Sequence, residues 1–282
     1  MIKISPFVPL HFDDGIVSDG LPSRYVQMFA SSDHIMVQVF ADASDTLEDA
    51  ELKNPHNGTV ICPIAWNEWD MNSGKKCFFL TLQGLSPGHY ILNVGGIDSD
   101  EFIITDDAQL LARTTLIQYR FKDNRQRDDV VSVIDFMPYF FDWRVPGGFK
   151  DSGWQFGVSN EQFVTQHEDV VELFAMDYVT KAFTMGGPEG VPVWYGEHLN
   201  RLLTCSYVYI DGHRYVRSDS ETPSLAILVD GLDSFVFTQT LRPATVLDPE
   251  IAALNQLALR RLGSTYYRDY VDNNEHINRK ID

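Results

Sequence analysis

Short runs of β-branched and large apolar residues recur along the first hundred residues of the chain. The runs lie at residues 34–40, 76–82, 88–94 and 101–105. In the third run Tyr90, Leu92 and Val94 occupy alternate positions, as on one face of a strand. Turn-forming pairs such as Asn57-Gly58 separate the runs. Strands at this spacing predict an N-terminal sandwich of two antiparallel sheets.

A polar joint follows the last of these runs, and the β-rich pattern then resumes. Asp106 or Asp107 can cap a short helical turn, so we place a domain boundary near Asp107. The later β-rich runs lie at residues 113–121, 128–136, 169–176, 181–185, 202–210, 213–217, 224–229 and 234–239. The run at 169–176 is compatible with strand or helix, and we favour strand because β-branched residues and Phe dominate it. Asp211-Gly212 predicts a tight hairpin, and Asp230-Gly231 marks a second turn.

One helix is predicted, close to the C-terminus. Asp248 is a suitable N-cap, Pro249 suits the first helical position, and Gly263 suits the position after the last turn. The whole pattern predicts a mainly β protein with two antiparallel β-sandwich-like domains and a C-terminal helix. The predicted divisions are an N-terminal domain at 1–107, a second β-rich domain at 108–245, and a helix with a tail at 246–282.

Residues 138–163 are the most informative segment. They combine aromatic residues, charges and the turn-forming sequence Pro146-Gly147-Gly148. The segment is too polar for a plain core strand and too aromatic for a plain solvent loop. We predict an aromatic-rich connection of the kind that carries contacts to another molecule. The candidate anchors are Trp143, Arg144, Phe149 and Trp154; the alternative is that the aromatic residues fill the end of a sandwich.

Charge restricts the possible partners. The 282-residue chain has 22 Lys and Arg against 40 Asp and Glu, a formal net charge of −18, which repels phosphate backbones. We therefore expect no nucleic-acid partner. One basic island stands out, with the residues Arg120, Lys122, Arg125 and Arg127. The island either meets an acidic surface on a partner or on another copy, or it pairs locally with Asp123, Asp128 and Asp129.

Neither a membrane segment nor a disulfide framework is expected. No apolar run approaches the roughly 18–20 residues that cross a bilayer, and the first residues lack the apolar region of a secretory signal. The three cysteines, Cys62, Cys77 and Cys205, are too few and too widely spaced for a disulfide scaffold or a zinc site. We expect free thiols, no metal, no cofactor and a protein that is made in a cytosol.

The common catalytic motifs are missing from the sequence, among them Gly-x-Ser-x-Gly, the phosphate-binding loop, His-Glu-x-x-His and Gly-x-Gly-x-x-Gly. The best paired carboxylates are Glu68 and Asp70, which lie beside Trp66 and Trp69. Tryptophans stack on sugar rings, so this segment supports an alternative function as a carbohydrate-binding module or adhesin. A glycosidase needs only two such carboxylates, and a strand edge with two anchoring tryptophans is the simpler interpretation.

Two further polar groups are candidates for acid–base or metal-binding chemistry. Glu197 and His198 are adjacent, so on a strand or a helix their side chains diverge, and a structural histidine is the simpler interpretation. Asp98, Asp100 and Glu101 resemble a weak calcium loop but lack the rest of the EF-hand pattern, which favours a polar turn. We therefore predict no catalytic residue.

Several phrases together resemble structural proteins in phage and prophage tail modules of gut Bacteroides-type bacteria. The phrases lie at residues 116–119, 122–125, 141–154, 160–163, 191–196 and 200–203. The resemblance covers mostly residues 113–240, and the overall organisation is also similar to distal tail proteins, which form rings between tail tube and baseplate. It implies a non-enzymatic tail component whose partners are other tail or baseplate proteins and copies of itself. Such a protein is located in the host cytoplasm during assembly and then in the virion.

Overall fold

The computed structural model of the chain describes residues 2–12, 23–71, 74–218, 224–227 and 232–244. It is mainly β, with 56% of residues in strands and 6% in helices, and most strand pairs are antiparallel. This confirms the predicted fold class at that level. The predicted C-terminal helix and the predicted turn at Asp230-Gly231 lie outside the described residues.

The N-terminal part is built from two sheets. The first has the order β1-β3-β7-β6, and the second has the order β2-β10-β8-β4-β5 with β9 beside β8. The bounds are β1 Lys3–Ile4, β2 Gln27–Ala30, β3 Ile35–Asp42, β4 Ala50–Lys53, β5 Val60–Ile64, β6 Asn67–Asp70, β7 Lys75–Leu82, β8 Gly88–Val94, β9 Ile97–Asp98 and β10 Phe102–Thr105. Buried residues of the two sheets, such as Val37 and Leu80 of the first and Leu92 and Phe102 of the second, share one apolar cluster. The four runs predicted in this part correspond to β3, β7, β8 and β10.

A short capped helix joins this part to the next. Helix α1 spans Ala108–Leu111, and the Asp107 carboxylate accepts hydrogen bonds from the backbone N–H groups of Gln109 (2.8 Å) and Leu110 (3.4 Å). The carboxylate thereby satisfies two of the N–H groups that a helix start leaves without partners. The predicted cap at the polar joint is therefore confirmed.

The second part is one sheet of seven strands in the order β15-β14-β11-β16-β17-β19-β18. The bounds are β11 Thr114–Arg120, β14 Phe141–Val164, β15 Val170–Met185, β16 Tyr207–Ile210, β17 His213–Arg217, β18 Ser224–Ile227 and β19 Phe235–Pro243, with a separate pair β12 Val133–Ile134 and β13 Met137–Pro138. Strand β15 pairs with both β14 and β19, so six of the strands close into a barrel. This differs from the stacked sheets predicted for residues 108–245, because Lys181–Met185 of β15 pair with β14 on one side and with β19 on the other.

Helix α2, Val193–Leu202, packs against the inside of this sheet. The sequence pattern predicted no strand or helix over residues 193–201. Gly196 faces β19 so closely that a Cβ there would clash with the ring of Phe237. A glycine is unfavourable inside a helix, and here it permits the close approach of the helix to the strand. The run predicted at 202–210 therefore begins as helix, and its strand starts at Tyr207.

The two parts share a continuous core. Phe7, Met36, Phe40 and Cys77 of the N-terminal part belong to the same buried cluster as the inward residues of the barrel and of α2. The amide of Gln38 donates to the carbonyl of Val131 (2.6 Å) and accepts from its N–H (2.9 Å). Packing and side-chain-to-backbone hydrogen bonds therefore fix the two parts against each other.

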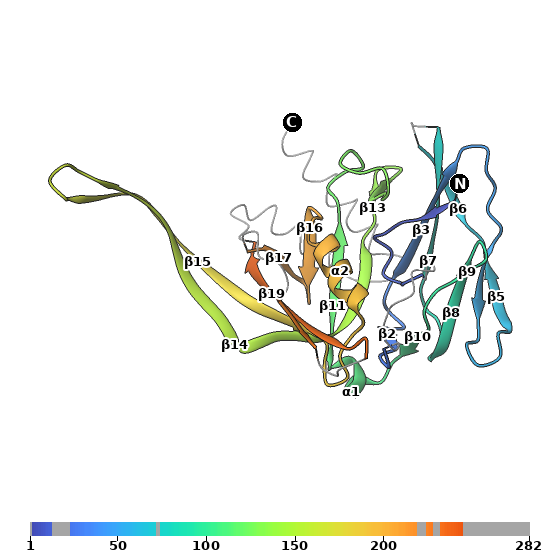
Figure 1. Cartoon of the computed structure of the whole chain (residues 1–282). Helices are drawn as coiled ribbons and strands as arrows, with labels where there is room; N and C mark the ends of the chain where they lie inside the picture. The colour runs from blue at the N-terminus through green and yellow to red at the C-terminus, as the bar shows by residue number, and fades with distance from the viewer. Residues whose placement is uncertain (1, 13–22, 72–73, 219–223, 228–231, 245–282) are drawn as a thin grey trace, which may run out of the picture.

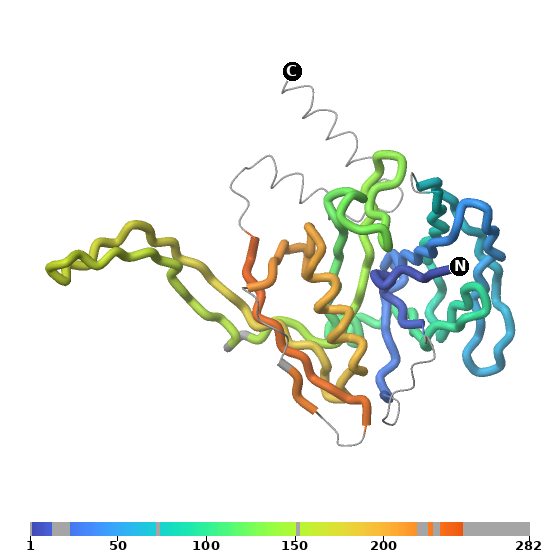
Figure 2. The backbone as a smooth tube through the Cα atoms, turned by 45° about the horizontal axis from the view of Figure 1, so that its top comes forward, coloured from blue at the N-terminus to red at the C-terminus, as the bar shows by residue number. Residues whose placement is uncertain are grey.

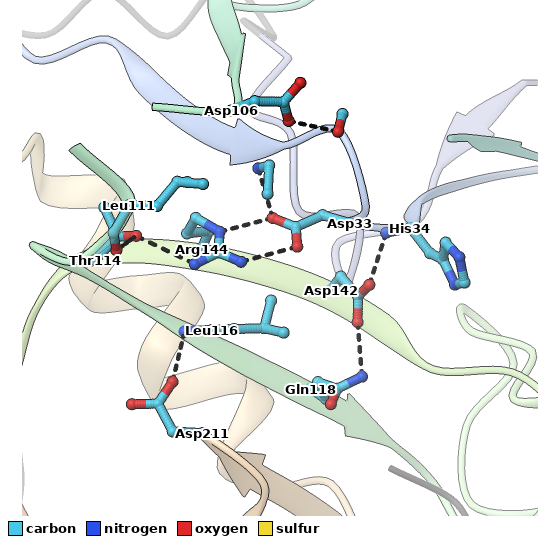
Figure 3. Close-up of polar contacts among 12 residues, drawn as sticks. Asp33, His34, Asp106, Leu111, Thr114, Leu116, Gln118, Asp142, Arg144 and Asp211 are labelled. Carbon is cyan, nitrogen blue, oxygen red and sulfur yellow. Dashed lines mark hydrogen bonds and ion pairs between the residues drawn. The ribbon is translucent and has the colours of Figure 1, made fainter. Parts of the chain in front are cut away.

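An ion pair lies at the same junction (Figure 3). The guanidinium of Arg144 on β14 donates to both carboxylate oxygens of Asp33, at 2.7 and 2.9 Å, and the Asp33 side chain is fully buried. The neighbouring Asp142 accepts from the backbone N–H of His34 (2.7 Å) and from the amide of Gln118 (3.0 Å). Alternate residues of β14 thus connect the barrel to the N-terminal part.

Beyond the barrel, β14 and β15 continue as a long two-stranded hairpin. We call residues 154–181 the arm; it projects from the rest of the molecule in two views that differ by 45° (Figures 1 and 2). Cα pairing runs from Trp154 opposite Lys181 to Val164 opposite Val170, with register shifts after Phe149 and after Glu161. Irregular registers of this kind bend a strand, and the first of them lies where the hairpin leaves the barrel. The segment predicted as a connection is therefore strand from Phe141 onward.

Candidate interaction surface

The first face of the arm is apolar near its base. Side chains alternate between the two faces of a strand pair, so Trp154, Phe156 and Val158 share a face with Val179 on the opposite strand. Phe156 is 80% exposed and Trp154 47%. Their rings stack with 6.3 Å between centroids. A stacked aromatic pair is therefore open to solvent.

The second face of the arm is apolar towards its tip. Phe163, Val171, Phe174 and Met176 share this face by register, and all four are exposed. Leu173, at the second register shift, is 61% exposed. Soluble monomers rarely expose large side chains in so contiguous a group unless the group binds something. The arm therefore has apolar patches on both faces.

The charge of the arm is almost entirely negative. It has five exposed acids and one cation, Lys181, at its base; the acids are Glu161, Glu168, Asp169, Glu172 and Asp177. The arm thus combines exposed apolar side chains with carboxylates, and a basic surface with apolar residues would complement it.

A groove of about 940 Å³ lies beside the base of the arm, and we call it the root groove. It is lined by Trp154, Met176, Asp177, Tyr178, Val179, Lys181, His213, Arg214, Tyr215, Val216, Arg242, Pro243 and Ala244. Lys181 lies 3.9 Å from the centroid of the Trp154 ring, and the Arg242 guanidinium lies 5.1 Å from that of Tyr178. The groove therefore combines cations with aromatic walls.

Phe149 and Trp154, two of the predicted anchors, have different environments. Phe149 is partly buried and packs on Phe183 (5.3 Å between ring centroids) and Tyr215 (4.7 Å), so it supports the base of the arm. Trp154 is exposed on the arm and lines the root groove. Trp154 therefore stays a candidate contact residue.

Of two further predicted contact residues, Trp143 is buried and Arg144 is largely buried, with 13% of its side chain exposed. Trp143 has no exposed surface and lies against Tyr195 and His198 of α2, with ring centroids 5.1 and 4.6 Å apart. Arg144 is engaged by Asp33 at the junction. Inward positions of a barrel strand accept bulky side chains, so the alternative that the aromatic residues fill the interior of a β-domain holds for Trp143. These two residues therefore hold the fold together.

The basic island is divided by the fold. Arg120 is buried, with its guanidinium 5.1 Å from the ring centroid of Phe140 and 4.6 Å from that of Tyr207. Arg127 pairs through two hydrogen bonds, of 2.7 and 2.6 Å, with Asp129, and this lowers the pKa of that carboxyl. The local pairing alternative therefore holds for Arg127. Lys122 and Arg125 are exposed, and their role as partner contacts stays a prediction.

The candidate glycan residues do not form one platform. Trp66 packs on the cluster of the N-terminal sheets and donates to the carbonyl of Glu48 (2.9 Å), whereas Trp69 packs on the shared core. Glu68 and Asp70 are exposed on β6, and Glu68 pairs with Lys76 at 2.9 Å. Two tryptophans on different clusters do not present a common stacking face.

The remaining polar candidates pair with side chains of the chain itself. Asp98 accepts from Lys53 (3.1 Å), Asp100 contacts His11 (3.2 Å), and Glu101 contacts His89 (2.5 Å). Within the described residues no group of three or more His, Cys, Asp or Glu side chains is arranged to hold a metal ion. None of the described helices is long and apolar enough to cross a membrane.

His198 is buried in α2, whereas Glu197 beside it is exposed. The Tyr119 hydroxyl lies 2.5 Å from the carbonyl of Phe7 and 2.9 Å from Nε2 of His198. A carbonyl only accepts, so the hydroxyl donates to Phe7 and Nε2–H of His198 donates to the hydroxyl. Burial lowers the pKa of His198 to about 3, with smaller contributions from Arg201 and His11. The imidazole is therefore neutral and structural.

This neutral imidazole predicts acid sensitivity. The folded pKa is below the unfolded value of 6.5, so its contribution to stability is complete above about pH 6.5 and is lost as the pH falls towards 3. The slope is at most about 1.4 kcal/mol per pH unit. Urea unfolding between pH 5 and 7 should show this slope in the wild type and a smaller one in His198→Gln. Equal slopes in the two proteins would contradict the assignment.

No protein-family model matches the chain, and no curated protein matches it. The arrangement of the side chains is therefore the basis for assigning a function.

Proposed function

We propose that this protein is a non-enzymatic structural component of a phage or prophage tail, or of a tail-like particle, and that it acts through protein–protein contacts. The observation that carries the proposal is the arm, which holds Phe156, Phe163, Leu173 and Phe174 in solvent. The resemblance of residues 113–240 to tail-module proteins supports the finer assignment, including a distal-tail-like place in a ring.

A role in protein–protein contacts is favoured because an arm that no partner covers is unfavourable in water. A two-stranded hairpin alone is marginally stable in water. The free energy falls when a partner covers exposed apolar side chains. The outer backbone edges of such a hairpin also offer N–H and C=O groups to another strand. An arm of this length and composition therefore fits a role in which it is covered by a neighbouring subunit.

The anchoring of the arm is consistent with assembly. Its strands enter the barrel as β14 and β15, which pair with β11 and β19 respectively, and the barrel shares its core with the N-terminal sheets. A rigid support fixes the direction of a projecting element and reduces the entropy lost on docking. The alternative of a carbohydrate-binding module has less support, because Trp66 and Trp69 lie on different clusters.

Shortening the arm should abolish incorporation while preserving the fold. Gly157 and Tyr178 face each other, so residues 158–177 can be replaced by Asn-Gly, which closes a two-residue hairpin. We expect an unchanged melting temperature, because the removed segment contributes nothing to the buried clusters. We expect the wild type to co-sediment with tail-like particles released from its host, and the shortened variant to stay in the soluble fraction.

The matched control is the double variant Glu68→Gln/Asp70→Asn, which removes the exposed carboxylates of β6 and should co-sediment like the wild type. A shortened variant that enters particles normally would remove the arm from the proposal. A wild-type protein that never accompanies particles would refute the tail assignment itself.

A further inference from the structure

We propose that the arm of one copy docks in the root groove of a second copy, so that the chain associates head to tail. This inference rests on the proposed function, and it names the partner of the arm as the protein itself. The outer part of the arm, residues 158–175, and the root groove are different surfaces of the same chain, because the groove is lined by the base of the arm and by β17 and β19. Contacts of that kind join subunits into a closed ring or an open filament rather than a two-fold dimer.

Charge is the first argument. The root groove contains three permanent cations, Lys181, Arg214 and Arg242, against one acid, Asp177. Among the described residues none of the three lies within 4.0 Å of a carboxylate oxygen. In a protein with a formal charge of −18 this is an unusual surface. The four carboxylates of the outer arm, Glu161, Glu168, Asp169 and Glu172, supply the opposite charge.

Shape is the second argument. The exposed aromatic and aliphatic side chains of the outer arm match the apolar part of the groove, which Tyr178 and Val179 form at the base of the arm together with Val216. Beyond the pair Lys181–Leu241, β15 no longer has β19 as a neighbour, so the groove opens where the two strands separate. Among the described strands nothing pairs with that edge of β15 over residues 170–180. An incoming strand can add to such an edge.

The donor of the arm is a second copy because the arm does not return to its own base. It extends away from the barrel in both views (Figures 1 and 2). Residues 245–282 follow Ala244 of the groove and are the other possible occupant. Their sequence contains six acids and five cations, so it does not match a cationic groove. The arm, with its acids, does.

Charge exchange tests the inference on the full chain. The arm variant is Glu161→Lys/Glu172→Lys, and the groove variant is Arg214→Glu/Arg242→Glu. Sedimentation velocity at about 50 mM NaCl should show concentration-dependent association of the wild type that added salt weakens. Each variant alone should have an association constant lower by about tenfold or more. An equimolar mixture of the two variants should associate, because each then meets a complementary surface.

Several results would overturn the inference: a wild type that stays monomeric, variants that associate like the wild type, or a mixture that stays monomeric. Melting temperatures identify a variant that fails to fold. Should the groove variant unfold, a benzoylphenylalanine photo-crosslinker in place of Phe174 decides instead, with one isotope-labelled copy. Crosslinks to residues 213–216 or 242–244 of the other copy support the inference, and crosslinks only to 245–282, only within one copy, or none, overturn it. Because particle incorporation is measured separately, failure here leaves the proposed function intact.

Discussion

Trp143→Ala is expected to lower the free energy of unfolding by about 3–5 kcal/mol. Trp143 has no exposed surface and belongs to the shared core, where it lies against Tyr195 and His198. Removing the indole leaves a cavity bounded by β14 and α2, and the closed barrel restricts the collapse that would fill it. Urea unfolding followed by circular dichroism measures the loss.

Trp154→Ala is the matched control, because the same type of residue in the same strand is there exposed on the arm. Surface substitutions usually change stability by less than about 0.5 kcal/mol, so the control should unfold like the wild type. Similar losses of unfolding free energy in Trp143→Ala and Trp154→Ala would contradict the prediction that the burial of Trp143 makes its replacement more costly. The pair also separates folding from association, since Trp154 lines the root groove.

Asp33→Ala is expected to cost about 3–5 kcal/mol, because it removes the carboxylate from the largely buried guanidinium of Arg144 and leaves it only the Thr114 hydroxyl (3.2 Å) as a side-chain partner. Asp33 also accepts a hydrogen bond from the backbone N–H of Ala30 (2.9 Å), so its loss affects the turn after β2 as well. The expected result is one cooperative transition at lower urea, because the two parts of the chain share a core. Chemical denaturation with two probes tests this.

The double variant Asp33→Ala/Arg144→Met provides the control for that experiment. It removes both charges and keeps an apolar side chain in the position of the guanidinium, so it should be more stable than Asp33→Ala alone. A double variant that is less stable by the sum of the single losses would show that the pair is not coupled. Two separate transitions in any variant would contradict the shared core.

The sequence correctly predicted turns, caps and strands whose conformation is determined by the residues within them. Asp211 and Gly212 both have positive φ angles, of 46° and 83°, as the two central residues of a tight hairpin require, and the sequence pair predicted that turn. Asp107 caps α1 as its position indicated. The strand assignment of residues 169–176 was also right, because β-branched residues favour extended backbone.

Elements that depend on distant residues were not predicted. Gly147 looked like part of a turn, yet it lies within β14 opposite Met185, and a side chain there would clash with the carbonyl of Thr184. The glycine is required by a strand nearly 40 residues further along the chain. The same limit applies to the candidate site. The local sequence does not distinguish Trp143 from Trp154. Trp143 is buried and Trp154 is exposed only because β14 runs out of the barrel between them.

The continuity of β14 has a consequence for force. The strand that carries Trp143 and Arg144 at the junction also forms one side of the arm, and the other side, β15, is paired with β19. Ladder hydrogen bonds lie perpendicular to the strands, so tension along the arm would load many of them at once in shear. A force applied to the tip of the arm by a neighbouring subunit would therefore be resisted by the strand pairs of the barrel before the hairpin separated from it.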